Sequence, residues 1–190
     1  NDAAAIATAV RQPSMRFVRI KSQEQQSHAM LFRSHQTFTR QRAQLLITLR
    51  GHLAEHGIIV AKGNAALLAF AERLEAEEGL VPDLVLESAR LYYHHIDQLA
   101  QTVATLERQM GEATKRDKDM RRLRTMPGVG PISAAAFLAF APPMESFRRG
   151  RDFAAWLGLV PKQLSTGGKT KLGRVGPVAV WCRSFDSIMC

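Results

Sequence analysis

Apolar residues recur at alternating spacings of three and four along one continuous stretch of the chain. They are Ala89, Tyr92, Ile96, Leu99, Val103, Leu106 and Met110. This is the a and d pattern of a helix that packs lengthwise against another helix. We therefore expect a long helix after Pro82, in a coiled coil or an antiparallel helical hairpin. The pattern leaves open whether the packing partner belongs to the same chain or to another protomer.

A second long helix is expected upstream of this stretch. Ser22 followed by Gln25 has the spacing of a capping box, and Gly57 is a typical residue for a helix end. The sequence therefore predicts a helix from Ser22 to about His56. An alanine-rich run over residues 3–10 predicts a shorter helix before it. The expected fold class is mainly α: long coiled-coil helices followed by a small helical domain.

Positive charge is concentrated in the last third of the chain. The 190 residues carry 26 Lys and Arg against 17 Asp and Glu, a net charge of +9. Residues 121–174 hold ten of the basic and two of the acidic side chains, so this segment alone carries +8. Charge concentrated in this way favours a polyanionic partner, because each phosphate that is neutralised releases bound counterions. A charge that serves only solubility is the alternative.

Composition excludes several other classes of protein. No apolar run approaches the roughly 18 residues of a membrane-spanning helix, and no secretory signal pattern is present. Only two cysteines occur, Cys182 and Cys190, so a disulfide framework or a cysteine-rich zinc site is excluded. We expect a soluble, intracellular protein with no membrane partner.

The segment Leu123–Leu138 has the layout of a helix-hairpin-helix motif. Gly128 and Gly130 would let the backbone turn tightly and approach a ligand closely. The helix that follows would present free N–H groups to a phosphate oxygen. An ordinary helical turn is the alternative. The flanking basic residues predicted to contact nucleic acid are Arg121, Arg122 and Arg124.

Residues 161–174 read as a basic loop that contains glycines and the adjacent hydroxyl side chains of Ser165 and Thr166. The glycine spacing does not match a P-loop. Two interpretations remain: a loop that contacts phosphates, which the residues alone favour, or a serine nucleophile that attacks a phosphodiester.

Four segments taken together resemble one protein family. They are NDAAAIATAVRQPSMRFVRIKSQEQQ, LRTMPGVGPISAAAFLA, FRRGRDFAAWLGLVP and PKQLSTGGKTKLGRV. The set resembles the insertion-sequence transposases of the 110 family, especially its 1111 subgroup, over about residues 1–175. The resemblance implies a DNA recombinase with a RuvC-like N-terminal domain, a coiled coil and a C-terminal domain that carries a catalytic serine.

The resemblance also implies cofactors, partners and residue roles. Mg²⁺ would be held by four acidic residues, of which Asp2 fits the last, and Ser165 fits the serine that forms a serine–phosphate linkage with DNA. A structured non-coding guide RNA, homo-oligomers through the coiled coil and a bacterial cytoplasmic, nucleoid-associated location are further implications. The residues that would face nucleic acid are Gly128, Gly130, Lys169, Lys171 and Arg174.

The resemblance divides the chain into four parts. Residues 1–21 would be the end of the RuvC-like domain, 22–118 the helical arm, 119–175 the C-terminal transposase domain and 176–190 an aberrant tail. The first three metal-binding acids are absent, and Asp2 by itself cannot hold two divalent ions. We therefore expect a partial, inactive copy of a transposase.

Two rival interpretations stay open. The first is a non-catalytic nucleic-acid-binding module that uses the helix-hairpin-helix on phosphates and oligomerises through the coiled coil. The second is a coiled-coil scaffold whose basic domain binds an acidic protein.

Overall fold

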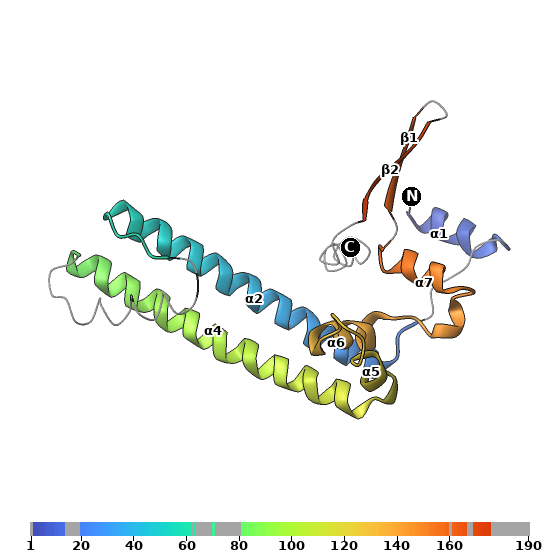
Figure 1. Cartoon of the computed structure of the whole chain (residues 1–190), viewed down its shortest axis with the longest axis horizontal. Coiled ribbons are helices and arrows are strands. Elements are labelled where there is room, and N and C mark those ends of the chain that lie inside the picture. Colours follow the sequence, from blue (N-terminus) through green and yellow to red (C-terminus); the bar gives the residue numbers. More distant parts are fainter. Residues whose placement is uncertain are drawn as a thin grey trace. The chain divides into compact units, whose positions relative to one another are not determined.

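A computed structural model describes residues 2–13, 20–61, 63, 70, 81–159, 161–166 and 169–175. The chain divides into two compact units, residues 1–140 and 141–190. The first unit contains five helices among its described residues, and the second contains short helices and a two-stranded sheet (Figure 1). The expected mainly α fold is confirmed.

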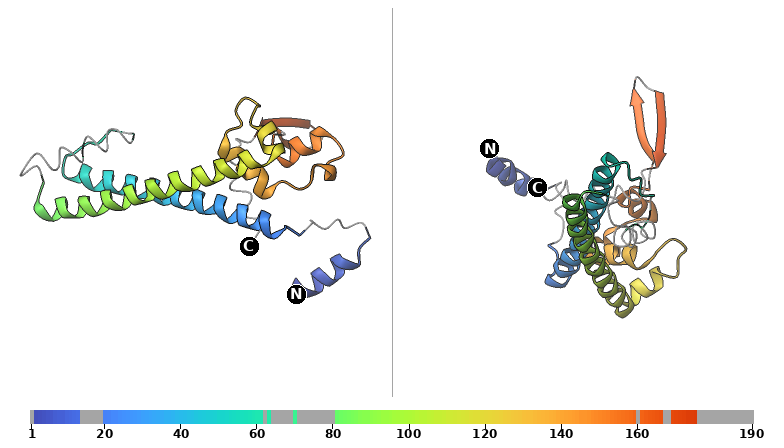
Figure 2. Two further views of the ribbon diagram at one scale, coloured as in Figure 1. Left: turned by 90° about the horizontal axis from the view of Figure 1, so that it is seen from below. Right: turned by 90° about the vertical axis from the view of Figure 1, so that its left-hand side faces the viewer.

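Two long helices form the arm of the first unit. Helix α2 (Gln23–Glu55) and helix α4 (Asp83–Arg116) lie side by side and run in opposite directions, as all three views show (Figures 1 and 2). His35 near the start of α2 contacts Glu107 near the end of α4, and His52 near the end of α2 contacts Tyr92 near the start of α4. Of the two arrangements that the heptad pattern allowed, the structure has the antiparallel pair within one chain.

The heptad residues lie where the two helices meet. Ala89, Ile96, Leu99 and Met110 are buried, and the other three seam residues are partly buried. One core cluster joins both helices near their connection, and it consists of Leu49, Leu53, Phe70, Val81, Ala89 and Ile96. Burial of this apolar stripe is the main force that holds the pair together, since long helices in water gain most of their stability from packing.

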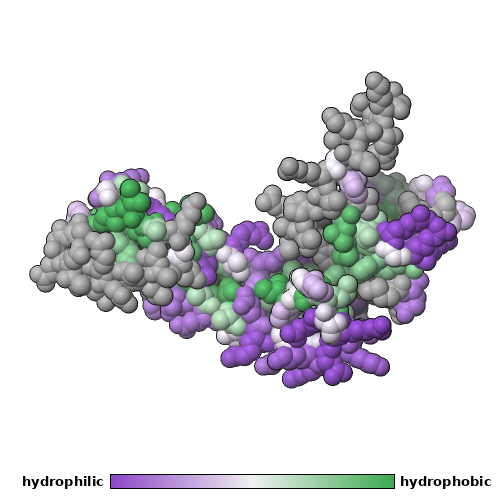
Figure 3. Space-filling view, in the orientation of Figure 1, coloured by the Kyte–Doolittle hydropathy of each residue, from purple (hydrophilic) through white to green (hydrophobic). Residues whose placement is uncertain are grey.

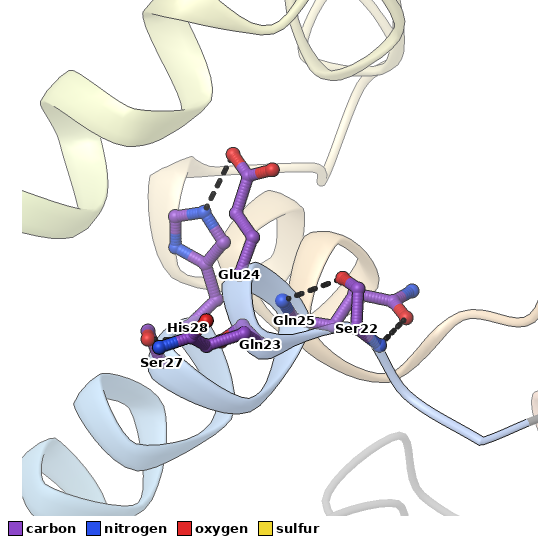
Figure 4. A network of polar contacts seen from close by, with 6 residues as sticks. All are labelled: Ser22, Gln23, Glu24, Gln25, Ser27 and His28. Carbon is purple, nitrogen blue, oxygen red and sulfur yellow. Dashed lines mark hydrogen bonds and ion pairs between the residues drawn. The ribbon is translucent and has the colours of Figure 1, made fainter.

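Helix α2 begins at the predicted capping box (Figure 4). The Ser22 hydroxyl accepts a hydrogen bond from the Gln25 backbone N–H at 3.2 Å, and the Ser22 backbone N–H donates to the Gln25 side-chain oxygen at 3.2 Å. The two bonds satisfy donors that a helix start otherwise leaves unpaired. The helix ends at Glu55 with His56 as its C-cap, and Gly57 follows with a φ of +76°.

Two further helices complete the first unit. Helix α5 (Lys118–Leu123) follows α4, and helix α6 (Pro131–Phe140) packs on both α2 and α4. The side of α6 that is buried consists mostly of alanines, whose small side chains let the helix axes approach closely. The buried residues of α6 are Ala134, Ala135, Ala136, Ala139 and Phe140.

The compact units are divided at another place than the domains that the family resemblance implies. That resemblance begins the C-terminal domain at residue 119, and this boundary stays a prediction. The first compact unit continues to Phe140, because the apolar side of α6 packs on the arm.

The second unit contains a 3₁₀ turn (Met144–Ser146), helix α7 (Gly150–Trp156) and the antiparallel strands β1 (Pro161–Thr166) and β2 (Lys169–Val175). Three aromatic rings pack together here: Phe147 lies 5.2 Å from Phe153 and 5.9 Å from Trp156 between ring centroids. The prediction of a loop over residues 161–174 is wrong, because this segment forms a β-hairpin. Two consecutive glycines are typical of a two-residue hairpin connection, but the glycines and charges alone do not distinguish such a hairpin from a loop.

The short N-terminal helix is also confirmed, as α1 (Asp2–Arg11). The predicted tail over residues 176–190 lies outside the described residues. Within the part of the chain that is described, no helix has both the length and the apolar composition needed to cross a bilayer.

Candidate nucleic-acid interface

Helix α5 presents two of the predicted arginines to solvent. Asp117 ends α4 and caps α5, because its side chain accepts a hydrogen bond of 2.8 Å from the Met120 backbone N–H. Arg121 and Arg122 follow on α5 and are exposed. Hydrophilic residues gather over the end of α4 and over α5 at the lower edge of the space-filling view (Figure 3). This surface is suited to contact with an anionic polymer.

Arg124 is held differently from its two neighbours. Its Nη1 donates to the Thr114 hydroxyl at 3.4 Å, and that hydroxyl donates to the backbone carbonyl of Gly111 at 3.0 Å. Thr114 is fully buried, so the Arg124 side chain is tied back to helix α4. The three arginines that the sequence grouped together therefore have two roles: two are free to contact a ligand, and Arg124 fixes α5 to the arm.

The turn between α5 and α6 requires one glycine and tolerates the other. The Val129 backbone N–H donates to the Met126 carbonyl at 3.2 Å, with Pro127 and Gly128 between them. Gly128 has a φ of +85°, so this is the arrangement of a type II turn, in which the third residue must be left-handed. Gly130 has no such φ, and a Cβ there would meet no atom within 4 Å. Its lack of a side chain leaves the backbone open to close approach.

The start of α6 lies directly after this turn. The Ala134 backbone N–H donates to the Gly130 carbonyl at 3.0 Å, which closes the first helical turn. Pro131 has no N–H, so the first-turn donors that can serve a ligand are those of Ile132 and Ser133. These donors and the helix dipole favour an anion at this position. The helix-hairpin-helix prediction itself stays a prediction, although Gly128, Gly130 and the arginines lie on one continuous segment.

The hairpin of the second unit carries the remaining predicted residues. Ser165 pairs with Thr170, and Thr166 pairs with Lys169 across the two strands. Because residues directly opposite each other share a face and successive residues alternate, positions 169 and 171 belong to the face opposite that of position 165. Only Gly167 and Gly168 separate the two strands, so Ser165 lies one residue from the tip connection.

Arg174 lies at an irregularity in this hairpin. Gln163 pairs with Leu172, but Pro161 pairs with Val175, so β2 has one extra residue in this interval. Bulges of this kind bend and twist a strand locally. The register therefore separates Arg174 from Lys169 and Lys171, which occupy the regular part of β2.

Asp2 is an exposed residue in the first turn of α1. A single carboxylate supplies at most two of the roughly six oxygens that Mg²⁺ requires. Among the described residues, no group of three or more Asp, Glu, His or Cys is arranged to hold a metal ion. The Mg²⁺ site that the family resemblance implies stays a prediction.

Two basic residues of this region were missed by the sequence interpretation. Lys21 and Arg33 both lie against the ring of Phe140 at the end of α6. They belong to the nearly neutral part of the chain, so a count of charges did not single them out. Thr114, which holds Arg124, carries no signal in the sequence at all.

Comparison with known proteins identifies relatives. A family model described as "Transposase IS116/IS110/IS902 family" matches residues 120–177. A putative transposase of Sinorhizobium fredii is 40% identical over 172 residues, which are 90% of this chain and 44% of that protein. A probable family 20 transposase of Pseudomonas aeruginosa is 41% identical over 177 residues, 92% of this chain and 52% of that protein. The transposase for insertion sequence element IS1111A of Coxiella burnetii is 32% identical over 174 residues, 90% of this chain and 48% of that protein.

The chain spans about half the length of these curated relatives. No solved structure matches the chain.

Proposed function

Because this chain belongs to the IS116/IS110/IS902 family of transposases, we propose that it binds DNA and takes part in strand cleavage and transfer as part of an insertion-sequence transposase. The observation that carries this proposal is its 40% and 41% identity, over about nine tenths of the chain, to proteins named as transposases. The concentration of positive charge in residues 121–174 supports a polyanionic substrate.

The first unit would hold the DNA backbone at the α5–α6 turn. Arg121 and Arg122 are exposed there and would form charge-assisted hydrogen bonds with phosphate oxygens. The open backbone at Gly130 and the first-turn N–H groups of α6 would receive a further phosphate. Contacts of this kind position a protein on DNA without reading its sequence. The α5–α6 turn is therefore proposed as a positioning surface.

Ser165 is the proposed nucleophile. Its hydroxyl oxygen would attack a DNA phosphorus, form a serine–phosphate bond and pass its proton to solvent. The bond from phosphorus to one deoxyribose oxygen would break, and that oxygen would leave as a hydroxyl after taking up a proton. A deoxyribose hydroxyl from a second strand would then attack the phosphorus and release the serine, so that no net bond is lost. Lys169 and Lys171, at positions on the other face of the hairpin from Ser165, and Arg174 at the irregularity of β2 would bind other phosphates of the nucleic acid.

Asp2 would contribute to a Mg²⁺ site only together with carboxylates beyond the described residues. A structured RNA is proposed as a second nucleic-acid partner.

A homo-oligomer is proposed as well. Because the α2–α4 seam is buried within one chain, a second copy would contact other residues of the arm. We propose Leu84 and Leu91, which are exposed on α4 and lie one heptad apart. Analytical ultracentrifugation of Leu91→Glu tests the oligomer: a shift to smaller species supports it, and an unchanged mass argues against it.

Covalent capture of DNA tests the role of Ser165. The protein is this chain, alone and joined to the part of the Coxiella burnetii IS1111A transposase that lies outside the match. The substrates are IS1111A DNA and RNA transcribed from it. Because Asp2 by itself cannot hold two divalent ions, we expect a protein–DNA adduct only in the joined protein. That adduct should survive denaturing electrophoresis and disappear in Ser165→Ala. Thr166→Ala is the matched control, because it removes a neighbouring hydroxyl at a position on the other face of the hairpin. An adduct that persists in Ser165→Ala contradicts the nucleophile assignment.

The same experiment distinguishes strand cleavage from the two rival interpretations. DNA binding by wild type with no adduct, even in the joined protein, indicates a nucleic-acid-binding module without strand cleavage. Binding to an acidic polypeptide such as polyglutamate, without binding to DNA, indicates a scaffold whose basic domain binds an acidic protein.

A further inference from the structure

Two cations lie against one aromatic ring where α2 and α6 meet. Lys21, the residue before the cap of α2, places its Nζ 4.8 Å from the ring centroid of Phe140. Arg33, on the third turn of α2, places its Cζ 5.7 Å from the same centroid. The ring itself is fixed, because Phe140 is buried and meets Phe32 edge to face at 5.5 Å.

The pair of cations has no anionic partner among the described residues. Neither of the ion pairs found there involves Lys21 or Arg33. The nearest acidic residue in sequence, Glu24, lies 3.9 Å from His28 instead (Figure 4). The pKa of Lys21 is lowered, first by partial burial and then by the charge of Arg33. Both causes disfavour the charged lysine, and an anion beside it would favour the charged form and so oppose them.

Contacts within the chain explain one cation better than two. A single cation over an aromatic ring near a helix C-terminus gains from the ring and from the helix dipole. A second cation on the same ring shares these gains and adds repulsion. The guanidinium of Arg33 and the ammonium of Lys21 together offer several N–H donors, which is the donor set that binds a phosphate.

We propose that Lys21 and Arg33 form an additional contact for a backbone phosphate of the nucleic acid, on the α2 side of the first unit. This inference rests on the proposed function, since it assumes that the chain binds a nucleic acid. The position is suitable: the ten residues of α6 span about 15 Å, or about four base-pair steps of 3.4 Å. One duplex is therefore long enough to reach both the α5–α6 turn and Phe140.

The test is the salt dependence of duplex DNA binding by the full chain. Lys21→Met and Arg33→Met, together, remove both charges but keep an apolar stem on the Phe140 ring. Affinity falls with salt, so the slope of log affinity against log salt concentration is negative. Each lost phosphate contact reduces the magnitude of this slope by about 0.9 and lowers affinity about eightfold at 0.1 M salt. We expect the magnitude to fall by about 1 if both side chains share one phosphate, and by about 2 if each has its own.

Two matched variants make the result specific. Arg90→Met removes an exposed cation near the start of α4. This variant is expected to leave the slope within half a unit of wild type. The exchange Lys21→Arg with Arg33→Lys keeps both charges and is expected to keep the slope. Circular dichroism and a melting curve confirm that each variant is folded.

The possible outcomes are distinct. An unchanged slope in the double methionine variant overturns the inference, whether or not its melting temperature falls, because the cations would then serve only the ring and the helix end. If wild type itself fails to bind DNA or RNA, the proposed function falls and the inference falls with it. A less steep slope in the double methionine variant, with the slopes of the two matched variants unchanged, supports both the proposed function and the inference.

Discussion

His35 on α2 and Glu107 on α4 are joined by a contact of 3.1 Å between Nε2 and Oε1. The two residues are 72 positions apart in the sequence, and the contact links the antiparallel helices near the end that carries α6. The His35 side chain is 9% exposed and that of Glu107 is 47% exposed. Of the described buried side-chain atoms, His35 Nδ1 is among those with no hydrogen-bond partner. The pair therefore adds a polar, directional contact between two helices whose buried residues are mostly apolar.

A double-mutant cycle on His35→Ala and Glu107→Ala measures what this contact contributes. Because Glu107 is half exposed, we expect a coupling of about 0.5–1 kcal/mol in the free energy of unfolding. Urea denaturation of the four proteins gives the value. The control is the pair Glu24 and His28, which lie 3.9 Å apart on one helix surface and should couple by about 0.3 kcal/mol. Equal coupling in both pairs would show that the cross-helix contact has no special weight.

The heptad seam gives a second prediction, on a single helix. Met110 is 1% exposed, and Met110→Ala should lower the free energy of unfolding by about 2–5 kcal/mol through lost burial and a residual cavity. Leu84 on the same helix is 74% exposed, and Leu84→Ala should change it by no more than about 0.5 kcal/mol. Thermal or urea unfolding separates the two. Similar losses at both sites would contradict the packing described for α4.

The two glycines of the α5–α6 turn should respond differently to alanine. Gly128→Ala forces a side chain into a left-handed conformation and should lower the free energy of unfolding by about 1 kcal/mol. Gly130→Ala meets no neighbour and should change it by less than about 0.5 kcal/mol, but it should weaken DNA binding by covering the backbone. Unfolding curves and filter-binding titrations on both variants give the comparison. Unaltered DNA affinity in Gly130→Ala would remove the turn backbone from the interface.

Tyr93 predicts a pH dependence at the alkaline end. Burial raises its pKa to about 12 from an ordinary value of 10.0, because the charged phenolate is poorly solvated. A group whose pKa is raised on folding stabilises the fold fully below its unfolded pKa, so this contribution is lost as pH rises from about 10 to about 12. An ultraviolet titration should show a late phenolate among the two tyrosines of the chain, and Tyr93→Phe should abolish it. If Tyr93→Phe removes the early phase of the titration and keeps the late one, the raised pKa does not belong to Tyr93.

Several elements could be predicted because their signals are local. The pair Ser22 and Gln25 predicts the start of α2, and the seam from Ala89 to Met110 predicts α4 and its buried side. The prediction of a loop around Ser165 is wrong because glycines and charges are common to loops and hairpins, and the pairing of β1 with β2 distinguishes them. The roles of the three arginines could not be separated, since only the position of Thr114 in the folded chain distinguishes Arg124 from Arg121.

The sequence by itself determined which segments are helical, which side of each long helix is apolar and where the positive charge lies, because these follow from spacing and composition along neighbouring residues. Only the tertiary structure decided that the seam is filled from within the chain, that α6 packs on the arm and that Lys21 and Arg33 meet on Phe140. The physical reason is that such contacts join residues far apart in the sequence. Their free energy depends on burial and distance, which exist only once the helices have packed.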